Sequence, residues 1–155
     1  MYKHIMIPLD GSPLAEAALP YALELANKFG SKLTLVRVLL PASQRFTQLG
    51  SSQDVQVMLE LHKKEQEAST RYLQDMQGSL SKQGFDVAAR VIEGIPVADH
   101  IIDEAHSMGV DTIVMSTHGR TGVGRLLFGS VAENVLRQAD MPVLLVRSVV
   151  SDKQK

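Results

Sequence analysis

The sequence predicts an α/β fold, a single doubly wound domain in which a five-stranded parallel sheet is flanked by four helices. Short apolar runs alternate with longer amphipathic stretches along the chain, which is the pattern of βαβ units. The length of 155 residues is about that of one domain, and 45% of the residues are hydrophobic, enough for a core covered by helices on two faces. Only 5% are aromatic, so the core is predicted to be aliphatic.

Five apolar runs are predicted to be the strands of this sheet. They cover residues 3–9, 32–39, 86–92, 111–116 and 142–147. Pro8 has no backbone N–H to donate, so it is expected at the end of the first strand, where the ladder needs no donor.

The first helix is predicted to begin with Ser12 as N-cap and Pro13 at the first helical position. It should end near Phe29, because Gly30 can adopt the left-handed conformation of a C-cap. Pro20 lies inside this pattern and lacks the N–H that a helix interior needs. The helix is therefore expected to kink or to split there.

A second helix is predicted over about residues 54–82, with Gly84 as the stop signal. One face carries an apolar stripe that we expect in the core, formed by Leu59, Tyr72, Leu73, Met76 and Leu80. The segment 41–52 before this helix is polar and interrupted by Gly and Pro. It is expected to be a mobile surface loop without a packed element.

The third helix is predicted to begin at Pro96, shortly after Gly94, and to end before Gly109. Its apolar spacing predicts that it buries Val97, Ile101, Ile102 and Ala105. A fourth helix is predicted to begin at Ser130.

The segment between the fourth strand and the fourth helix carries the pattern with the most chemistry. Gly119 has no Cβ, so a phosphate can approach its backbone closely, and Gly129 offers the same after nine intervening residues. Ser130 and Glu133 have the Ser-x-x-Glu spacing of a capping box, which would orient free amides and the positive end of the helix dipole toward the turn. Arg120 could add charge-assisted hydrogen bonds to a bound anion.

This pattern has two interpretations when the residues are considered alone. The first is an anion site at the start of the fourth helix. The second is that the glycines and the capping box only start a helix, because neither the Walker pattern nor the Rossmann fingerprint is present.

The chain resembles the ATP-binding branch of the universal stress protein family. That family marks its phosphate and ribose loop with Gly-x-x-Gly, nine residues, then Gly-Ser or Gly-Thr, and this chain has Ser116-x-x-Gly119, nine residues, then Gly129-Ser130. The resemblance also covers the first strand and turn at 5–12, the helix entry at 94–96 and the final segments at 132–136 and 141–146. The chain departs from the family at Ser116, which adds a Cβ and a hydroxyl at the first motif glycine.

The resemblance implies the strand order 3-2-1-4-5, a nucleotide-binding domain over residues 1–148 and a short polar tail at 149–155. It also implies that the cofactor is ATP, with Mg²⁺ or Mn²⁺ bound through the nucleotide. Asp10 would face the ribose or that metal, and the backbone of Val38 would bind the edge of the adenine. The remaining implied contacts are to the base and the phosphates, from Pro8, Leu9, Met115, Ser116, His118, Gly119, Arg120, Gly129, Ser130 and Val131.

The general rule for open parallel sheets predicts the same location. Ligands bind beyond the carboxyl ends of the strands, where the winding direction reverses. In the implied strand order, strands one and four flank that point, and Asp10 and Ser116 come from these two strands.

The last strand, 142–147, would leave an apolar edge open to pairing, so a homodimer through this strand is predicted. The resemblance implies the same arrangement, together with a signalling or protective role in the stress response. The alternative is a nucleotide-free dimeric stress adaptor of the same fold.

Composition excludes several other classes of function. A net charge of −1 does not favour a nucleic-acid partner, and the absence of cysteine excludes thiol chemistry and Cys-based metal sites. No stretch reaches the roughly 20 apolar residues that span a bilayer. No membrane association is therefore expected, and because the N-terminus lacks the pattern of a signal peptide, the expected location is the cytoplasm.

Two other doubly wound classes and an efficient enzyme fit the sequence less well. A receiver domain needs clustered acids after the first strand, where this chain has a lone Asp10, and a flavodoxin needs a Ser/Thr-rich phosphate loop there. No set of nucleophile, base and acid is visible, and there is no Walker lysine. The sequence therefore predicts a binding or signalling module with at most slow ATP hydrolysis.

Overall fold

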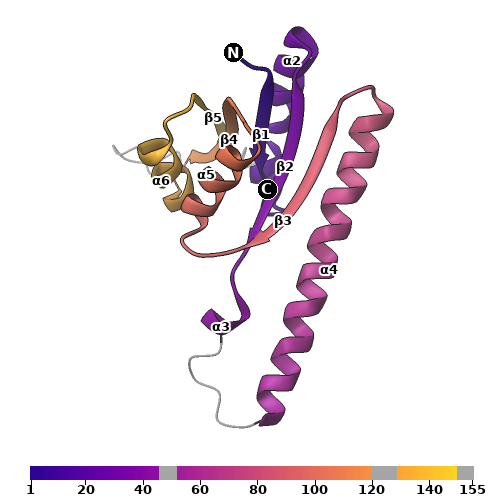
Figure 1. The fold of residues 1–155 in the computed structure, drawn as a ribbon, viewed down its shortest axis with the longest axis vertical. Helices are drawn as coiled ribbons and strands as arrows, with labels where there is room; N and C mark the ends of the chain where they lie inside the picture. The colour runs from indigo at the N-terminus through magenta and orange to yellow at the C-terminus, as the bar shows by residue number, and fades with distance from the viewer. Residues whose placement is uncertain (46–51, 120–128, 150–155) are drawn as a thin grey trace, which may run out of the picture.

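The protein forms one parallel sheet with helices on both faces (Figure 1). The computed structural model describes residues 1–45, 52–119 and 129–149. Its strand order is β3-β2-β1-β4-β5, which confirms the predicted α/β fold and strand order. The strands, all paired in parallel, are β1 (His4–Pro8), β2 (Lys32–Leu39), β3 (Val87–Glu93), β4 (Thr112–Gly119) and β5 (Val143–Val149).

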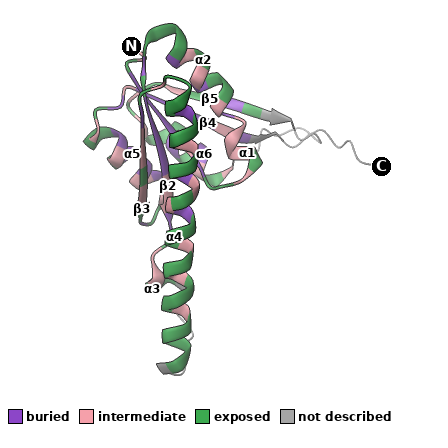
Figure 2. Ribbon diagram, turned by 90° about the vertical axis from the view of Figure 1, so that its right-hand side faces the viewer, coloured by how far each residue is buried: buried purple, intermediate pink, exposed green. Residues whose placement is uncertain are grey.

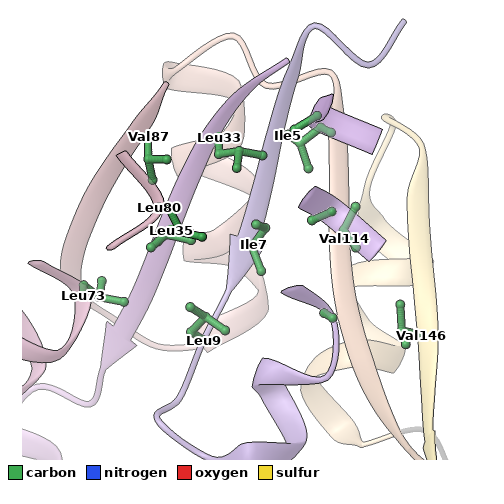
Figure 3. Close-up of a cluster of buried hydrophobic side chains, with 13 residues drawn as sticks. Ile5, Ile7, Leu9, Leu33, Leu35, Leu73, Leu80, Val87, Val114 and Val146 are labelled. Atoms are coloured by element: carbon green, nitrogen blue, oxygen red, sulfur yellow. The ribbon is translucent and has the colours of Figure 1, made fainter. Parts of the chain in front are cut away.

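The helices divide between two layers that each cover one face of the sheet. Against one face pack α1 (Pro13–Glu16), α2 (Leu19–Phe29) and α4 (Ser52–Lys82), and against the other pack α5 (Val97–Ser107) and α6 (Ser130–Gln138). Figure 3 shows the first core, in which Leu73 and Leu80 of α4 meet Leu33 and Leu35 of β2. Ile5, Met6 and Ile7 of the central strand are 0% exposed, because successive side chains enter opposite cores.

The predicted first helix splits at the proline, as expected. Ser12 caps α1 with its Oγ, which accepts a hydrogen bond from the Ala15 amide at 3.1 Å. A second helix begins at Leu19, so Pro20 falls in the first turn of α2, where its missing N–H costs no hydrogen bond. Gly30 ends α2 with φ of +65°, which confirms the predicted left-handed cap.

The prediction for the long helix was wrong in its N-terminal half. Leu73 and Leu80 are buried and Tyr72 and Met76 pack against the same core, but Leu59 is 51% exposed. A 31-residue helix is about 46 Å long, roughly twice the length of β3, so its first turns extend past the sheet. Figures 1 and 2 show this projecting end, which also exposes Val55, Val57 and Leu61.

Apart from shifts of one or two residues at other strand and helix ends, three segments differ from the sequence predictions. The segment predicted to lack a packed element contains a short helix, α3 (Ala42–Arg45), while residues 46–51 lie outside the described part. The fourth strand is longer than predicted, and its ladder with β5 includes His118 and Gly119, which were assigned to a loop. Of the predicted C-terminal tail, only Val149 is described, as the last residue of β5.

The third predicted helix corresponds to α5, and it buries Ile101, Ile102 and Ala105 as predicted, with Val97 half-buried. The glycine before it is required by a close side-chain contact. A Cβ added at Gly94 would lie 2.1 Å from the imidazole ring of His100, whose Nδ1 donates a hydrogen bond to the Pro96 carbonyl at 3.0 Å.

Gly94→Ala is therefore expected to displace the His100 ring and to lower the free energy of unfolding by about 1–3 kcal/mol, the usual cost of overpacking. Urea denaturation measures this change. In a His100→Ala background the same substitution should cost much less, because the clashing ring is gone. Equal costs in the two backgrounds would contradict the proposed clash.

Candidate functional site

A cavity of about 290 Å³ opens at the carboxyl ends of β1 and β4. These two strands lead into helices on opposite faces of the sheet, α1 after β1 and α6 after β4, so the cavity lies at the topological switch point. It is lined by Pro8, Leu9, Asp10, Ser12, Leu14, Ala15, Val36, Val38, Val97, Ile101, Met115, Ser116, Gly129, Ser130, Val131 and Ala132.

The lining combines an apolar wall with a few polar groups. Most of the residues that line it are aliphatic, while Asp10, Ser12, Ser116 and Ser130 supply a carboxylate and three hydroxyls. These four polar residues come from the β1–α1 turn, from β4 and from the start of α6. An apolar cavity with few convergent polar groups is the usual form of a small-molecule site.

The β1–α1 turn holds Asp10 at the cavity in a defined conformation. Asp10 Oδ1 accepts a hydrogen bond from the Ser12 amide at 2.9 Å, and Gly11 between them has φ of +84°. Burial by itself would raise the pKa of Asp10, but hydrogen bonds from Ser12 and the nearby charge of Arg37 outweigh it and lower that pKa below its ordinary value. The exposed Asp10 side chain is therefore an anion at neutral pH.

The predicted capping box at the start of α6 is wrong. The N-cap is Gly129, with no side-chain cap, and Ser130 is the first helical residue. The Glu133 carboxylate instead accepts a hydrogen bond from Arg137 at 2.9 Å, because the (i, i+4) spacing places the two side chains on one helix surface. Without a side-chain cap, the first amides of α6 have no partner within their helix and lie beside the cavity.

The structure brings nine of the twelve predicted site residues to this cavity. His118 and Gly119 are the last residues of β4, and Arg120 lies outside the described residues. The nine are Pro8, Leu9, Asp10, Val38, Met115, Ser116, Gly129, Ser130 and Val131.

Seven of the described lining residues were not predicted from the sequence. Three of them are Val36, Val97 and Ile101. Val36 could have been found from Val38, because side chains two apart on a strand share a face, and Val97 and Ile101 lie one helical turn apart on α5. The others are Ser12, Leu14, Ala15 and Ala132, whose roles as cap and helix residues masked their position at the cavity.

A resident metal ion does not fit the described residues by themselves. Within them, no group of three or more His, Asp or Glu side chains is arranged to hold a metal. A lone carboxylate such as Asp10 fits Mg²⁺ that keeps its waters and takes its other ligands from phosphate.

No helix within the described residues is both long and apolar enough to cross a membrane.

The fold and the cavity together define a doubly wound α/β protein with a ligand-sized site at its switch point. The sequence profile of the Universal stress protein family matches residues 1–147, and the chain belongs to that family.

Two members of the family match this chain over most of their own length. The universal stress protein MJ0531 of Methanocaldococcus jannaschii is 33% identical over 147 residues, which cover 95% of this chain and 83% of the relative. MJ0577 of the same organism is 31% identical, covering 95% of this chain and 96% of the relative.

Solved structures support the same fold. The structure of MJ0577 matches with a TM-score of 0.78 and 30% identity, covering 97% of this chain and 99% of that one. A universal stress protein solved in complex with cAMP matches with a TM-score of 0.64 and 22% identity, covering 96% of this chain and 98% of that one.

Proposed function

We propose that this protein binds an adenine nucleotide, with ATP as the expected ligand, in the cavity at the switch point, and that it acts in stress-response signalling or protection. The observation that carries the proposal is the arrangement of that cavity. An aliphatic pocket lies between the end of β2, which supplies Val38, and the start of α6, with the Asp10 carboxylate beside it. In a bound nucleotide, the base would lie in the aliphatic pocket near Val38, the ribose beside the Asp10 carboxylate, and the phosphate chain at the start of α6.

The backbone of Val38 supports the position of the base. Even-numbered residues of β2 direct their backbone groups toward β1, since the Lys32 amide donates to Lys3 and the Val36 carbonyl accepts from Leu9. By the two-residue period, the amide and carbonyl of Val38 point the same way, just past the end of β1. Among the described residues they have no backbone partner, so they are available to an adenine edge.

The other end of the cavity suits the phosphates. The first amides of α6, which have no partner within their helix, and the positive end of its dipole favour an anion. Asp10 would bind a ribose hydroxyl or a Mg²⁺ or Mn²⁺ ion carried by the nucleotide. The relative solved with cAMP shows that a protein of this fold accommodates an adenine nucleotide.

The test is a nucleotide analysis of the purified protein followed by a titration. Heat-denatured protein should release adenine nucleotide detectable by mass spectrometry, and protein stripped of it should bind ATP in a calorimetric titration with Mg²⁺. Asp10→Asn should weaken binding while keeping the turn, because an amide oxygen can still accept from Ser12. Asp103→Asn, an exposed change on α5, is the matched control. A stripped wild-type protein that binds no adenine nucleotide would favour the nucleotide-free adaptor.

We further propose a homodimer through β5. This strand lies at the edge of the sheet and, within residues 1–45, 52–119 and 129–149, pairs with β4 alone, and its Leu144 side chain is 39% exposed. The Ile113 amide donates to the Pro142 carbonyl, so the backbone groups of even-numbered residues face β4 and those of Leu145 face outward. An open edge of this kind favours pairing with a second copy.

Leu145→Pro is expected to give a monomer, because it removes an outward N–H while keeping the ladder to β4. Arg147→Pro should do the same at an exposed position with no core side chain to lose. By contrast, Leu144→Pro removes an N–H that faces β4 and should destabilise the fold. Sedimentation velocity together with thermal melts measures these effects, and a wild-type monomer at micromolar concentration would disprove the dimer.

A further inference from the structure

We propose that Arg37, Tyr72 and Glu16 are positioning residues of the binding site, which together hold the turn from Asp10 to Ser12 in its ligand-binding shape. The three side chains come from β2, α4 and α1, and none of them lines the cavity. The expected effect on affinity depends on the proposed nucleotide function. The expected effect on the turn does not depend on it.

The first contact is between Arg37 and the middle of the turn. Val36 and Val38 line the cavity, so Arg37 between them points to the opposite face of the sheet. There its guanidinium lies against Gly11, since a Cβ added to Gly11 would be 2.8 Å from Arg37 Nη1. The left-handed conformation of Gly11, with φ of +84°, and the absence of a side chain both allow this approach.

The second contact joins Arg37 to the long helix. The Arg37 guanidinium carbon lies 5.9 Å from the centre of the Tyr72 ring, within the range of a cation–π interaction. Arg37 and Tyr72 are both half-buried, which strengthens such an interaction relative to a fully hydrated pair. The ring therefore limits the positions that the guanidinium can take beneath Gly11.

The third contact returns to the turn through α1. The Tyr72 hydroxyl donates a hydrogen bond to Glu16 Oε1 at 2.7 Å, and Glu16 is the last residue of the helix that Ser12 caps. Burial, followed by the hydrogen bond to Glu16, raises the pKa of Tyr72 well above its ordinary value, so the phenol keeps the proton that it donates. The contacts thus form a closed ring from β2 through α4 and α1 to the turn.

The contacts among Arg37, Tyr72 and Glu16 have a direct consequence for Asp10. The Asp10 carboxylate is held by the Ser12 amide, whose position depends on both Gly11 and the start of α1. Burial has the largest effect on the pKa of Asp10 and raises it, while the hydrogen bonds from Ser12 and, to a smaller extent, the positive charge of Arg37 lower it and favour the ionised form. Loss of Arg37 should therefore loosen the turn and make Asp10 easier to protonate.

The experiment uses Arg37→Gln and Tyr72→Phe in the full chain. Arg37→Gln should lower ATP affinity about tenfold, equivalent to about 1.4 kcal/mol, and Tyr72→Phe, which keeps the ring but loses the bond to Glu16, about threefold. The matched controls are Arg90→Gln, an exposed arginine on β3 near Glu104, and Tyr21→Phe, a 56% exposed tyrosine on α2. Both controls should stay within about twofold of wild type.

A double-mutant cycle separates positioning from general stability. In an Asp10→Ala background, Arg37→Gln should change affinity by less than about twofold, because the group it positions is absent. If Arg37→Gln weakens binding equally with and without Asp10, Arg37 does not act through the turn and the proposal is overturned.

A second measurement needs no nucleotide. Carboxyl-carbon NMR titration of the ligand-free protein should show a higher Asp10 pKa in Arg37→Gln than in wild type, with shifted amide signals at Gly11 and Ser12. If wild-type protein fails to bind ATP, the proposed function fails, and this titration alone judges the positioning role. An Asp10 pKa and turn amides unchanged by Arg37→Gln overturn the positioning role whatever the protein binds.

Discussion

Gly129→Val should abolish ATP binding and leave the protein folded. Gly129 lines the cavity as the N-cap of α6, with φ of −58° and ψ of 146°, a conformation open to any residue. The valine side chain therefore causes no backbone strain, and under the proposed function we expect it to block the approach of a phosphate to the first amides of α6. We expect an affinity loss of about a hundredfold or more, measured by calorimetry.

The control for this variant is Gly78→Val on α4, where a Cβ would meet nothing within 4 Å. It should bind ATP as wild type does. Circular-dichroism melts of both variants separate binding from stability. A folded Gly129→Val protein with wild-type affinity would show that the phosphates do not approach α6.

Leu73→Ala should be the more damaging of two matched changes on α4. Leu73 is 1% exposed and packs in the core between α4 and the sheet, so its truncation should lower the free energy of unfolding by about 2–5 kcal/mol. Leu59→Ala removes the same atoms from a side chain that is 51% exposed and should change stability by no more than about 0.5 kcal/mol.

Urea denaturation of the two variants measures this difference directly. Both leucines lie on the apolar stripe that the sequence predicts, so only their surroundings distinguish them. A large loss in Leu59→Ala would mean that the first turns of α4 are covered in solution, for example by a second copy of the chain.

Much of the fold was predictable from local sequence because the determining interactions are local. Parallel strands buried on both faces appear as continuous apolar runs, and the run at 32–39 matches β2 at both ends. The N-cap at Ser12, the split near Pro20 and the left-handed Gly30 also follow from the conformational limits of single residues.

The candidate site was predictable in part. The strand order places Asp10, just after β1, near Ser116 of the neighbouring strand β4, and nine of the twelve predicted residues meet at the cavity. The capping box failed because Ser-x-x-Glu also permits a pairing of Glu133 with Arg137, and the sequence does not show which one forms.

The sequence by itself determined the order of strands and helices, the caps and breaks of its first helices and the aliphatic composition of the core, since these depend on neighbouring residues. The tertiary structure decided what depends on residues far apart in the chain. The exposure of Leu59 follows from where the sheet ends, and the contacts that join Arg37 to Gly11 and to Tyr72 come from β2, the β1–α1 turn and α4. No local pattern encodes these distances, because they arise only when the elements pack against one another.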